Sequence, residues 1–216
     1  MPHKADVSVA LSVALAAGYW YHSESHKTTS IIAIKTASTA LLTLAHYLRE
    51  HPIQGRLFTL SMAGHCIGDF LLELSLIYAI PFFLFGHMLY AWKLKNNCIR
   101  LNEINMHQIM ALIIIGIYSM NFTQLLRDNT HGVLYHAIPI YCVALTAMFM
   151  LTVLQKQNAK SLFFAATLYV LSDSLIGVNK FVKKLPGIGY ITWPLYFAGQ
   201  AFAAKCLWNN KKSISP

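Results

Sequence analysis

The stretch LFTLSMAGHCIGDFLLELSLIYAIPFFLFGHMLYAWKLK, residues 57–95, decides the fold class of this chain. It is apolar almost throughout, and a helix that crosses a bilayer needs only about 20 residues. Because the stretch is too long for one helix, it predicts two consecutive membrane spans, about 57–77 and 79–95. Pro81 supports a break between them, since proline is tolerated in the first turn of a helix.

Apolar runs of similar length recur along the whole chain. Polar breaks divide it into eight expected spans, at about 5–22, 30–48, 57–77, 79–95, 106–125, 133–154, 160–178 and 189–208. The first run resembles a signal peptide, but its aromatic end, GYWYH, suits the membrane interface better than a cleavage site. The sequence therefore predicts an all-α polytopic membrane protein, with residues 1–216 as a single transmembrane domain.

Composition agrees with this class. Of the 216 residues, 56% are hydrophobic and 12% are charged, with a mean hydropathy of +0.48, whereas a soluble domain has roughly 25% charged residues. The net charge is +9, but the basic residues are spread through short loops, so we expect no nucleic-acid partner. The four cysteines are scattered without metal spacing or a compact disulfide pattern, which favours packing roles. The sequence carries no signal for the oligomeric state.

The distribution of basic residues predicts the orientation. With eight spans, one side carries Lys4, Arg49, Arg56, Lys93, Lys95, Arg100, Lys156, Lys160, Lys205, Lys211 and Lys212. The other side carries Lys27, Arg127, Lys180, Lys183 and Lys184. The positive-inside rule then places both termini in the cytoplasm. The membrane would be the inner or plasma membrane of a bacterium, or the endoplasmic reticulum of a eukaryote.

Two aspartates lie deep inside apolar runs. Asp69 lies in the third expected span and Asp173 in the seventh. A charge in hydrocarbon costs about 2.5–3.5 kcal/mol on insertion scales, so an intramembrane acid marks a functional site by default. Both spans run outward, and at about 1.5 Å per residue both acids lie roughly 18–20 Å from the cytoplasmic end. The sequence predicts that they share one level, somewhat past the midplane.

Other polar side chains fall near this level, which indicates one buried polar cavity inside the helix bundle. The candidate substrate-binding residues are Lys35, His87, Tyr90, Asn121, Ser172, Tyr196 and Gln200. Several have simpler interpretations. Lys35 could reach the interface or pair with an aspartate, Ser172 could bond the backbone of its own helix, and His87 could be a satisfied core histidine. Asn121 could hold helices together, as could Tyr196 with Gln200.

His65, Asp69 and Glu73 are spaced four apart and line one face of the third span. Imidazole and carboxylate together suit divalent cations. However, no second cluster of ligands occurs on another span, so we expect no metal and no other cofactor. Glu73 is expected near the outer interface, where a charge is less costly.

Four segments resemble signature segments of the lysoplasmalogenase (YhhN-like) family: IGDFLLE at 67–73, FGHMLYAW at 85–92, LYVLSDSLIGVNKF at 168–181 and WPLYFAGQ at 193–200. Lys35 and Met148 also resemble family positions, although Thr36 stands where the family usually has proline. The resemblance implies eight-span membrane enzymes that cleave the vinyl ether bond of lysoplasmalogens to a fatty aldehyde and a glycerophospho head group. It implies a lysophospholipid substrate and a catalytic role for Asp69 and Asp173.

The residues suit that chemistry. A vinyl ether hydrolyses when an acid protonates its outer alkene carbon and a negative charge stabilises the resulting oxocarbenium ion. Two carboxyl groups in different environments can do both. Two alternatives stay open. Intramembrane carboxylates with a nearby lysine also serve proton-coupled transporters, although the chain shows no repeated halves. The polar layer could also belong to a structural scaffold.

Overall fold

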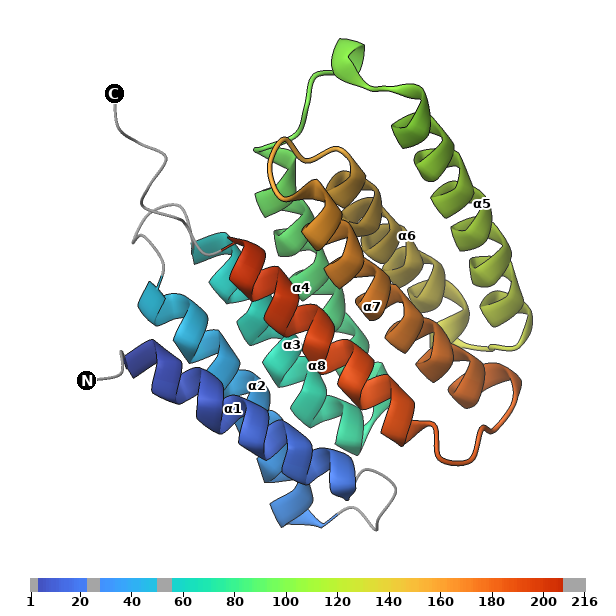
Figure 1. Ribbon diagram of the computed structural model, residues 1–216. Helices are drawn as coiled ribbons and strands as arrows, with labels where there is room; N and C mark the ends of the chain where they lie inside the picture. The colour runs from blue at the N-terminus through green and yellow to red at the C-terminus, as the bar shows by residue number, and fades with distance from the viewer. Residues whose placement is uncertain (1–3, 23–27, 50–55, 208–216) are drawn as a thin grey trace.

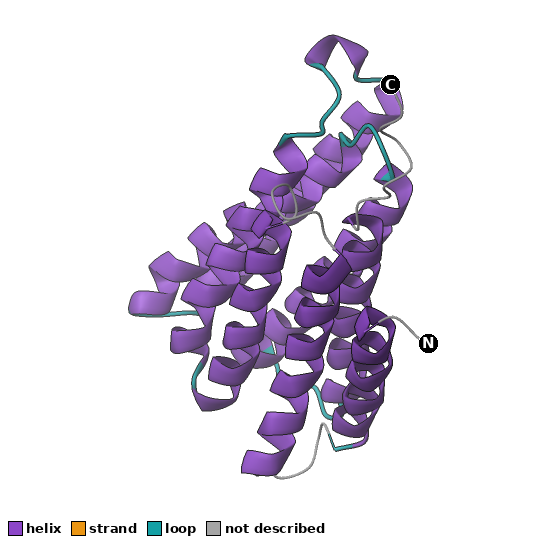
Figure 2. Ribbon diagram, turned by 90° about the vertical axis from the view of Figure 1, so that its left-hand side faces the viewer, coloured by secondary structure: helices purple, strands orange, loops and turns teal. Residues whose placement is uncertain are grey.

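The computed structural model describes residues 4–22, 28–49 and 56–207. Within these ranges the chain forms helices and no β-strand (Figure 2). The eight α-helices are α1 (Lys4–Tyr21), α2 (Thr29–Arg49), α3 (Arg56–Leu74), α4 (Leu76–Lys95), α5 (Met106–Asp128), α6 (Val133–Val153), α7 (Ala159–Gly177) and α8 (Gly189–Leu207). A 3₁₀ turn, η1 (Leu101–Glu103), precedes α5, and a π-helical turn, η2 (Val178–Val182), follows α7. The predicted all-α class and the eight helical segments are confirmed.

The break inside residues 57–95 has a different cause from the expected one. Ser75 alone adopts an extended conformation, with φ −164° and ψ 135°, and α4 begins at the next residue. Pro81 is therefore the sixth residue of α4, not part of its first turn. The interpretation of Pro81 as a helix start is wrong. Only one residue separates the two helices. The backbone hydrogen bonds of α3 continue as far as Ser75, whose N–H donates to Leu71 O at 2.8 Å.

Helices that are consecutive in the sequence alternate in direction, so α1 begins at the end of the bundle where α8 finishes (Figure 1). Helix α8 packs against α7, α1, α2 and α3, whereas α5 lies at the far edge against α6 and η2. The sequence gives α5 little to bury. Its buried side chains are Ile115 and Leu126, while Ile114 and Met120 are 62% and 75% exposed.

Six of these helices, α2 to α7, are long and apolar enough to cross a membrane. Helices α1 and α8 have 18 and 19 residues and fall outside this set. Large apolar side chains are exposed on the outside of the bundle, as lipid contact requires. The chain is therefore an integral multi-pass membrane protein. Of the basic residues used for the orientation, Lys27, Lys211 and Lys212 lie outside the described residues.

Small residues bring the central helices close together. A Cβ atom on Gly86 of α4 would lie 2.5 Å from the His65 ring of α3, so only glycine fits there. Ser61 Oγ also donates to Gly86 O at 2.7 Å. On the other side, a Cβ on Gly199 of α8 would lie 3.0 Å from Ala165 O of α7. These close approaches fix α3 to α4 and α7 to α8, which carry most of the polar residues described below.

Candidate active site

A cavity of about 510 Å³ lies inside the bundle, and every one of the eight helices contributes to its wall. Its polar lining includes Tyr19, Lys35, Asp69, Glu73, Tyr141, Ser172, Asp173, Asn179, Lys180, Lys184 and Tyr196. Much of the remaining wall is aliphatic or aromatic. Such a combination, an apolar hollow with a few converging polar groups, is typical of a small-molecule site.

Asp69 of α3 is almost fully buried, with 1% of its surface exposed. Tyr196 of α8 donates its hydroxyl hydrogen to Asp69 Oδ2 at 3.0 Å. Gln200 Nε2, one helical turn further along α8, donates to the Tyr196 oxygen at 2.5 Å. The i, i+4 spacing of Tyr196 and Gln200 puts both on one face of α8. Together they form a directed chain of hydrogen bonds that ends on Asp69.

Lys35 and Glu73 form a buried ion pair beside Asp69. Lys35 Nζ lies 2.7 Å from Glu73 Oε1, and the side chains are 6% and 9% exposed. The Tyr19 hydroxyl donates to the same Glu73 oxygen at 3.1 Å. Lys35 Nζ also donates to Asp69 at 3.4 Å, but to its backbone carbonyl. One expectation is thereby corrected: the ion-pair partner of Lys35 is Glu73 and not an aspartate. Glu73 lies in the cavity wall, in the last turn of α3.

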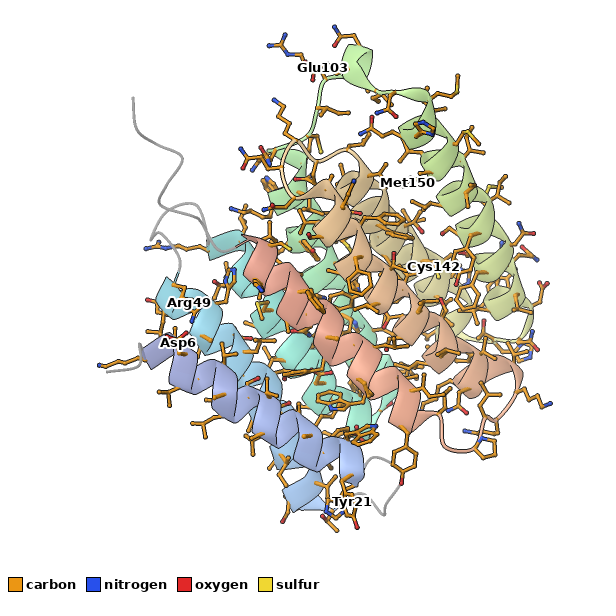
Figure 3. The ribbon with its side chains drawn as sticks, viewed as in Figure 1. Asp6, Tyr21, Arg49, Glu103, Cys142 and Met150 are labelled. Atoms are coloured by element: carbon orange, nitrogen blue, oxygen red, sulfur yellow. The ribbon has the colours of Figure 1, made fainter. Side chains whose placement is uncertain are left out.

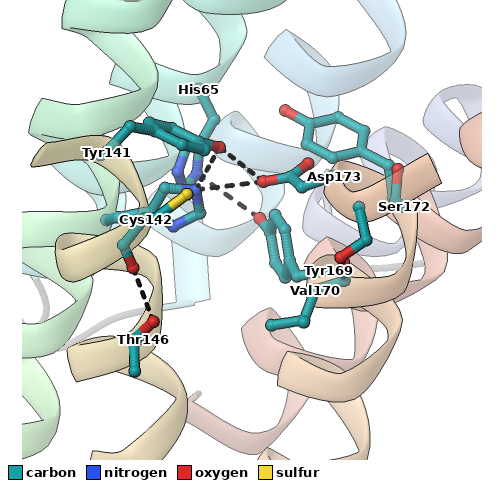
Figure 4. A network of polar contacts seen from close by, with 12 residues as sticks. His65, Tyr141, Cys142, Thr146, Tyr169, Val170, Ser172 and Asp173 are labelled. Atoms are coloured by element: carbon teal, nitrogen blue, oxygen red, sulfur yellow. Dashed lines mark hydrogen bonds and ion pairs between the residues drawn. The ribbon is translucent and has the colours of Figure 1, made fainter. Parts of the chain in front are cut away.

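Asp173 of α7 has different partners. Tyr141 of α6 donates its hydroxyl hydrogen to Asp173 Oδ2 at 2.5 Å (Figure 4). His87 Nε2 of α4 lies 3.1 Å from the Tyr141 oxygen and 3.6 Å from Asp173 Oδ2. Because Tyr141 uses its hydrogen toward Asp173, His87 must donate from Nε2 to the Tyr141 oxygen. The Asp173 side chain is 15% exposed, and the cavity is the space that it faces.

A second histidine lies directly behind His87. The His65 and His87 ring centroids are 4.7 Å apart, and His65 Nδ1 lies 3.4 Å from the Tyr169 hydroxyl. His65, Asp69 and Glu73, which share one face of α3, are not grouped as metal ligands. Within the part of the chain that the structure describes, no group of three or more His, Cys, Asp and Glu side chains is arranged to hold a metal ion.

The structure brings most of the predicted site residues together. Lys35, Asp69, Ser172, Asp173 and Tyr196 line the cavity. His87 and Gln200 lie behind this wall and reach the aspartates through the tyrosines that they contact. Ser172 does not bond its own helix, because its hydroxyl donates to Thr192 O of α8 at 3.0 Å.

Two predicted residues lie elsewhere. Asn121 is exposed on the outside of α5, where its amide donates to Ile117 O of the same helix. It faces away from the cavity. Tyr90 is fully buried in the core and packs edge-on against Phe58, with ring centroids 4.7 Å apart. Neither residue lines the cavity.

Tyr141 is the functional candidate that the sequence did not reveal. It lies in the segment YHAIPIYCVAL at 135–145, which looks like an ordinary apolar span. One signal was available: a tyrosine in the middle of a span must find a hydrogen-bond partner for its hydroxyl. That rule identifies Tyr141 as polar and buried, but it does not say that the partner is Asp173.

Comparison with known families gave a match over most of the chain. The model of one protein family, YhhN, matches residues 30–207. The matched range contains both aspartates and every helix except α1. Neither the curated proteins nor the solved structures gave a match.

Proposed function

Because the chain belongs to the YhhN family, the family of lysoplasmalogenases, we propose that it hydrolyses the vinyl ether bond of lysoplasmalogens. The products would be a fatty aldehyde and glycerophosphoethanolamine or glycerophosphocholine. One observation carries the proposal beyond the family. Asp69 and Asp173 come from helices far apart in the sequence, line the same cavity and have different hydrogen-bond partners.

The reaction needs one proton donor and one stabilising negative charge. Protonation of the outer alkene carbon gives an oxocarbenium ion at the carbon that bears the ether oxygen. Water adds to this carbon and loses a proton, and the hemiacetal then breaks into the aldehyde and the glycerol hydroxyl. One water molecule is consumed and no electrons are transferred. A protonated carboxyl group and an ionised one are sufficient for these steps, as in glycosidases, which pass through a similar cation.

The surroundings of each carboxyl group support complementary roles. In the proposal, one of Asp69 and Asp173 protonates the alkene, and the other stabilises the cation and orients the water. Tyr196 and Tyr141 hold the two carboxyl groups in position, since each donates to one carboxylate oxygen, and both aspartates line the cavity. The apolar wall would exclude bulk water and strengthen these electrostatic interactions.

We expect purified protein in detergent to release aldehyde from a 1-alkenyl lysophospholipid. The 1-alkyl analogue, which differs only by lacking the alkene, should not be cleaved, because it offers no carbon to protonate. Aldehyde would be measured by a coupled dehydrogenase assay. Release of fatty acid from the 1-acyl analogue, measured separately, with no aldehyde from the 1-alkenyl substrate would assign an esterase. No product from any of the three substrates with well-folded protein would refute the proposed hydrolysis.

Tyr141→Phe should slow aldehyde release by about tenfold or more, because a hydrogen bond to a charged group contributes about 1.5–3 kcal/mol. The variant removes only the hydroxyl that donates to Asp173. Tyr135→Phe is the matched control, since Tyr135 lies on the same helix, bonds Arg127 and does not line the cavity. Equal rates for Tyr141→Phe and wild type would show that this hydrogen bond does not contribute to the reaction.

A further inference from the structure

The cavity extends beyond the carboxyl groups to the connection between α7 and α8. There its wall is formed by Asn179, Lys180 and Lys184. Both lysines are exposed, and neither has an acidic partner within 4.0 Å among the described residues. They differ in this from Lys35, whose charge Glu73 balances. One end of the cavity therefore carries positive charge that no group of the described chain compensates.

The two lysines are held in a defined place. The π-helical turn Val178–Val182 continues α7, and Lys183 N–H donates back to Val178 O at 2.9 Å. Asn179 Oδ1 accepts from Leu185 N–H at 2.8 Å, which ties the loop back to the turn. The lysine side chains are long, but their backbone positions beside the cavity are fixed by these bonds.

Asp173 and Lys180 lie on one face of the same helical segment. Asp173, Ile176, Gly177 and Lys180 all line the cavity, and their spacing of three, four and seven residues is that of a single helical face. At about 1.5 Å per residue, the two positions are roughly 10 Å apart along the helix axis. In a lysoplasmalogen, seven bonds of about 1.5 Å join the phosphorus to the outer alkene carbon, which gives an extended span of about 9 Å.

The rest of this part of the cavity is mostly apolar. On the side of Asp173 away from the lysines, the wall between α5, α6 and α7 includes Ile115, Leu145, Phe149 and Val170. The polar lining residues of this region bond one another in pairs, Tyr118 with Ser174 and Ser119 with Thr146. A hydrocarbon chain would bury its surface here at about 25 cal/mol per Å². Along the cavity the positive charge comes first, then Asp173 with Tyr141 beside it, then the apolar region. The substrate has the same order of groups: phosphate, vinyl ether and alkenyl chain.

Resting on the proposed function, we propose that Lys180 and Lys184 bind the phosphodiester of the lysophospholipid, with the alkenyl chain between α5, α6 and α7 and the vinyl ether beside Asp173. The lysines act as point charges on the phosphate oxygens. They bind the substrate and its transition state alike, because the phosphate takes no part in the reaction. Their loss should therefore raise KM and leave kcat nearly unchanged.

The test compares the double variant Lys180→Gln/Lys184→Gln with wild type in mixed micelles of fixed composition. We expect KM for the 1-alkenyl lysophospholipid to rise about tenfold or more. KM for 1-alkenylglycerol, which lacks the phosphate, should be the same in both proteins. Lys183→Gln is the matched control, because it removes the same charge from the same loop at a residue that does not line the cavity. Arginine at positions 180 and 184 should restore a low KM.

A binding measurement separates this proposal from the proposed reaction. The uncleaved 1-alkyl lysophospholipid should raise the melting temperature of wild type more than that of the double variant. If wild type releases no aldehyde but shows this difference, the reaction is wrong and the phosphate site stands. If wild type is active and the double variant has an unchanged KM, or an equal rise for the phosphate-free substrate, the site is wrong. An equal melting shift with inorganic phosphate alone would overturn the assignment to a lipid.

Discussion

The Asp69→Asn and Asp173→Asn variants should each release aldehyde from lysoplasmalogen at least about 10²-fold more slowly than wild type, because general acid–base catalysis contributes about 10²–10⁴-fold. Asparagine keeps the size of the side chain and one oxygen that accepts from Tyr196 or Tyr141. It can neither deliver a carboxyl proton nor carry a negative charge. Initial rates at saturating substrate measure the effect directly.

Asp128→Asn provides the matched control for this measurement. Asp128 ends α5, accepts from Gln124 Nε2 and does not line the cavity. Its variant should retain the wild-type rate. If Asp69→Asn and Asp173→Asn elute and melt like wild type and also keep its rate, the two-carboxylate mechanism is incorrect.

The double variant adds a second criterion. If both carboxyl groups act in the same step, their losses are not additive, because either substitution alone already removes that step. The rate of the Asp69→Asn/Asp173→Asn protein should then lie within about tenfold of the rate of the slower single variant. Fully multiplicative losses would indicate that the two groups act independently, for example in substrate binding and in catalysis.

The helices were predictable because two strong signals coincide in a membrane chain. Apolar runs are long, and the polar breaks between them are short, so the ends of α5, α6 and α7 agree with the expected spans to within three residues. The weak point was the junction at Ser75, where no charge or glycine marks the break.

The site was predictable only in part, and the reason is geometrical. Asp69 and Asp173 could be identified because a carboxyl group in hydrocarbon is costly wherever it points. Which groups meet them depends on how each helix is rotated about its axis. Asn121 was expected in the polar layer but faces outward, whereas Tyr141 faces inward and carries no charge that would reveal it. Depth can be counted along a sequence, but rotation is set by packing against neighbouring helices.

Lys35 and Glu73 also meet because of how their helices are rotated: the sequence placed them in different surroundings, and the structure pairs them at 2.7 Å. Glu73→Gln should destabilise the protein by about 3–5 kcal/mol, because it leaves the Lys35 charge buried without its counter-ion. For a chain of this size that corresponds to a fall of roughly 10 °C in melting temperature. Differential scanning fluorimetry in detergent measures it without any substrate.

Asp6→Asn is the control that separates the effect of burial from the effect of losing a charge. Asp6 pairs with Arg49 where α1 begins and α2 ends (Figure 3), and these side chains are 53% and 26% exposed. An exposed ion pair contributes about 0–1 kcal/mol, so this variant should melt within about 3 °C of wild type. An equal effect of Asp6→Asn and Glu73→Gln would mean that the buried position of the second pair is unimportant.

Removal of both charges decides what the buried pair does. A pair replaced by neutral side chains of similar volume is often as stable as the original, since no charge then needs to be desolvated. Lys35→Met/Glu73→Gln should therefore recover most of the melting temperature that Glu73→Gln loses. Because Lys35 Nζ also contacts the Asp69 carbonyl, the recovered protein need not recover its rate of aldehyde release. A stable but slow double variant would assign the ion pair to the positioning of Asp69, whereas a double variant less stable than Glu73→Gln would contradict the account of the pair given above.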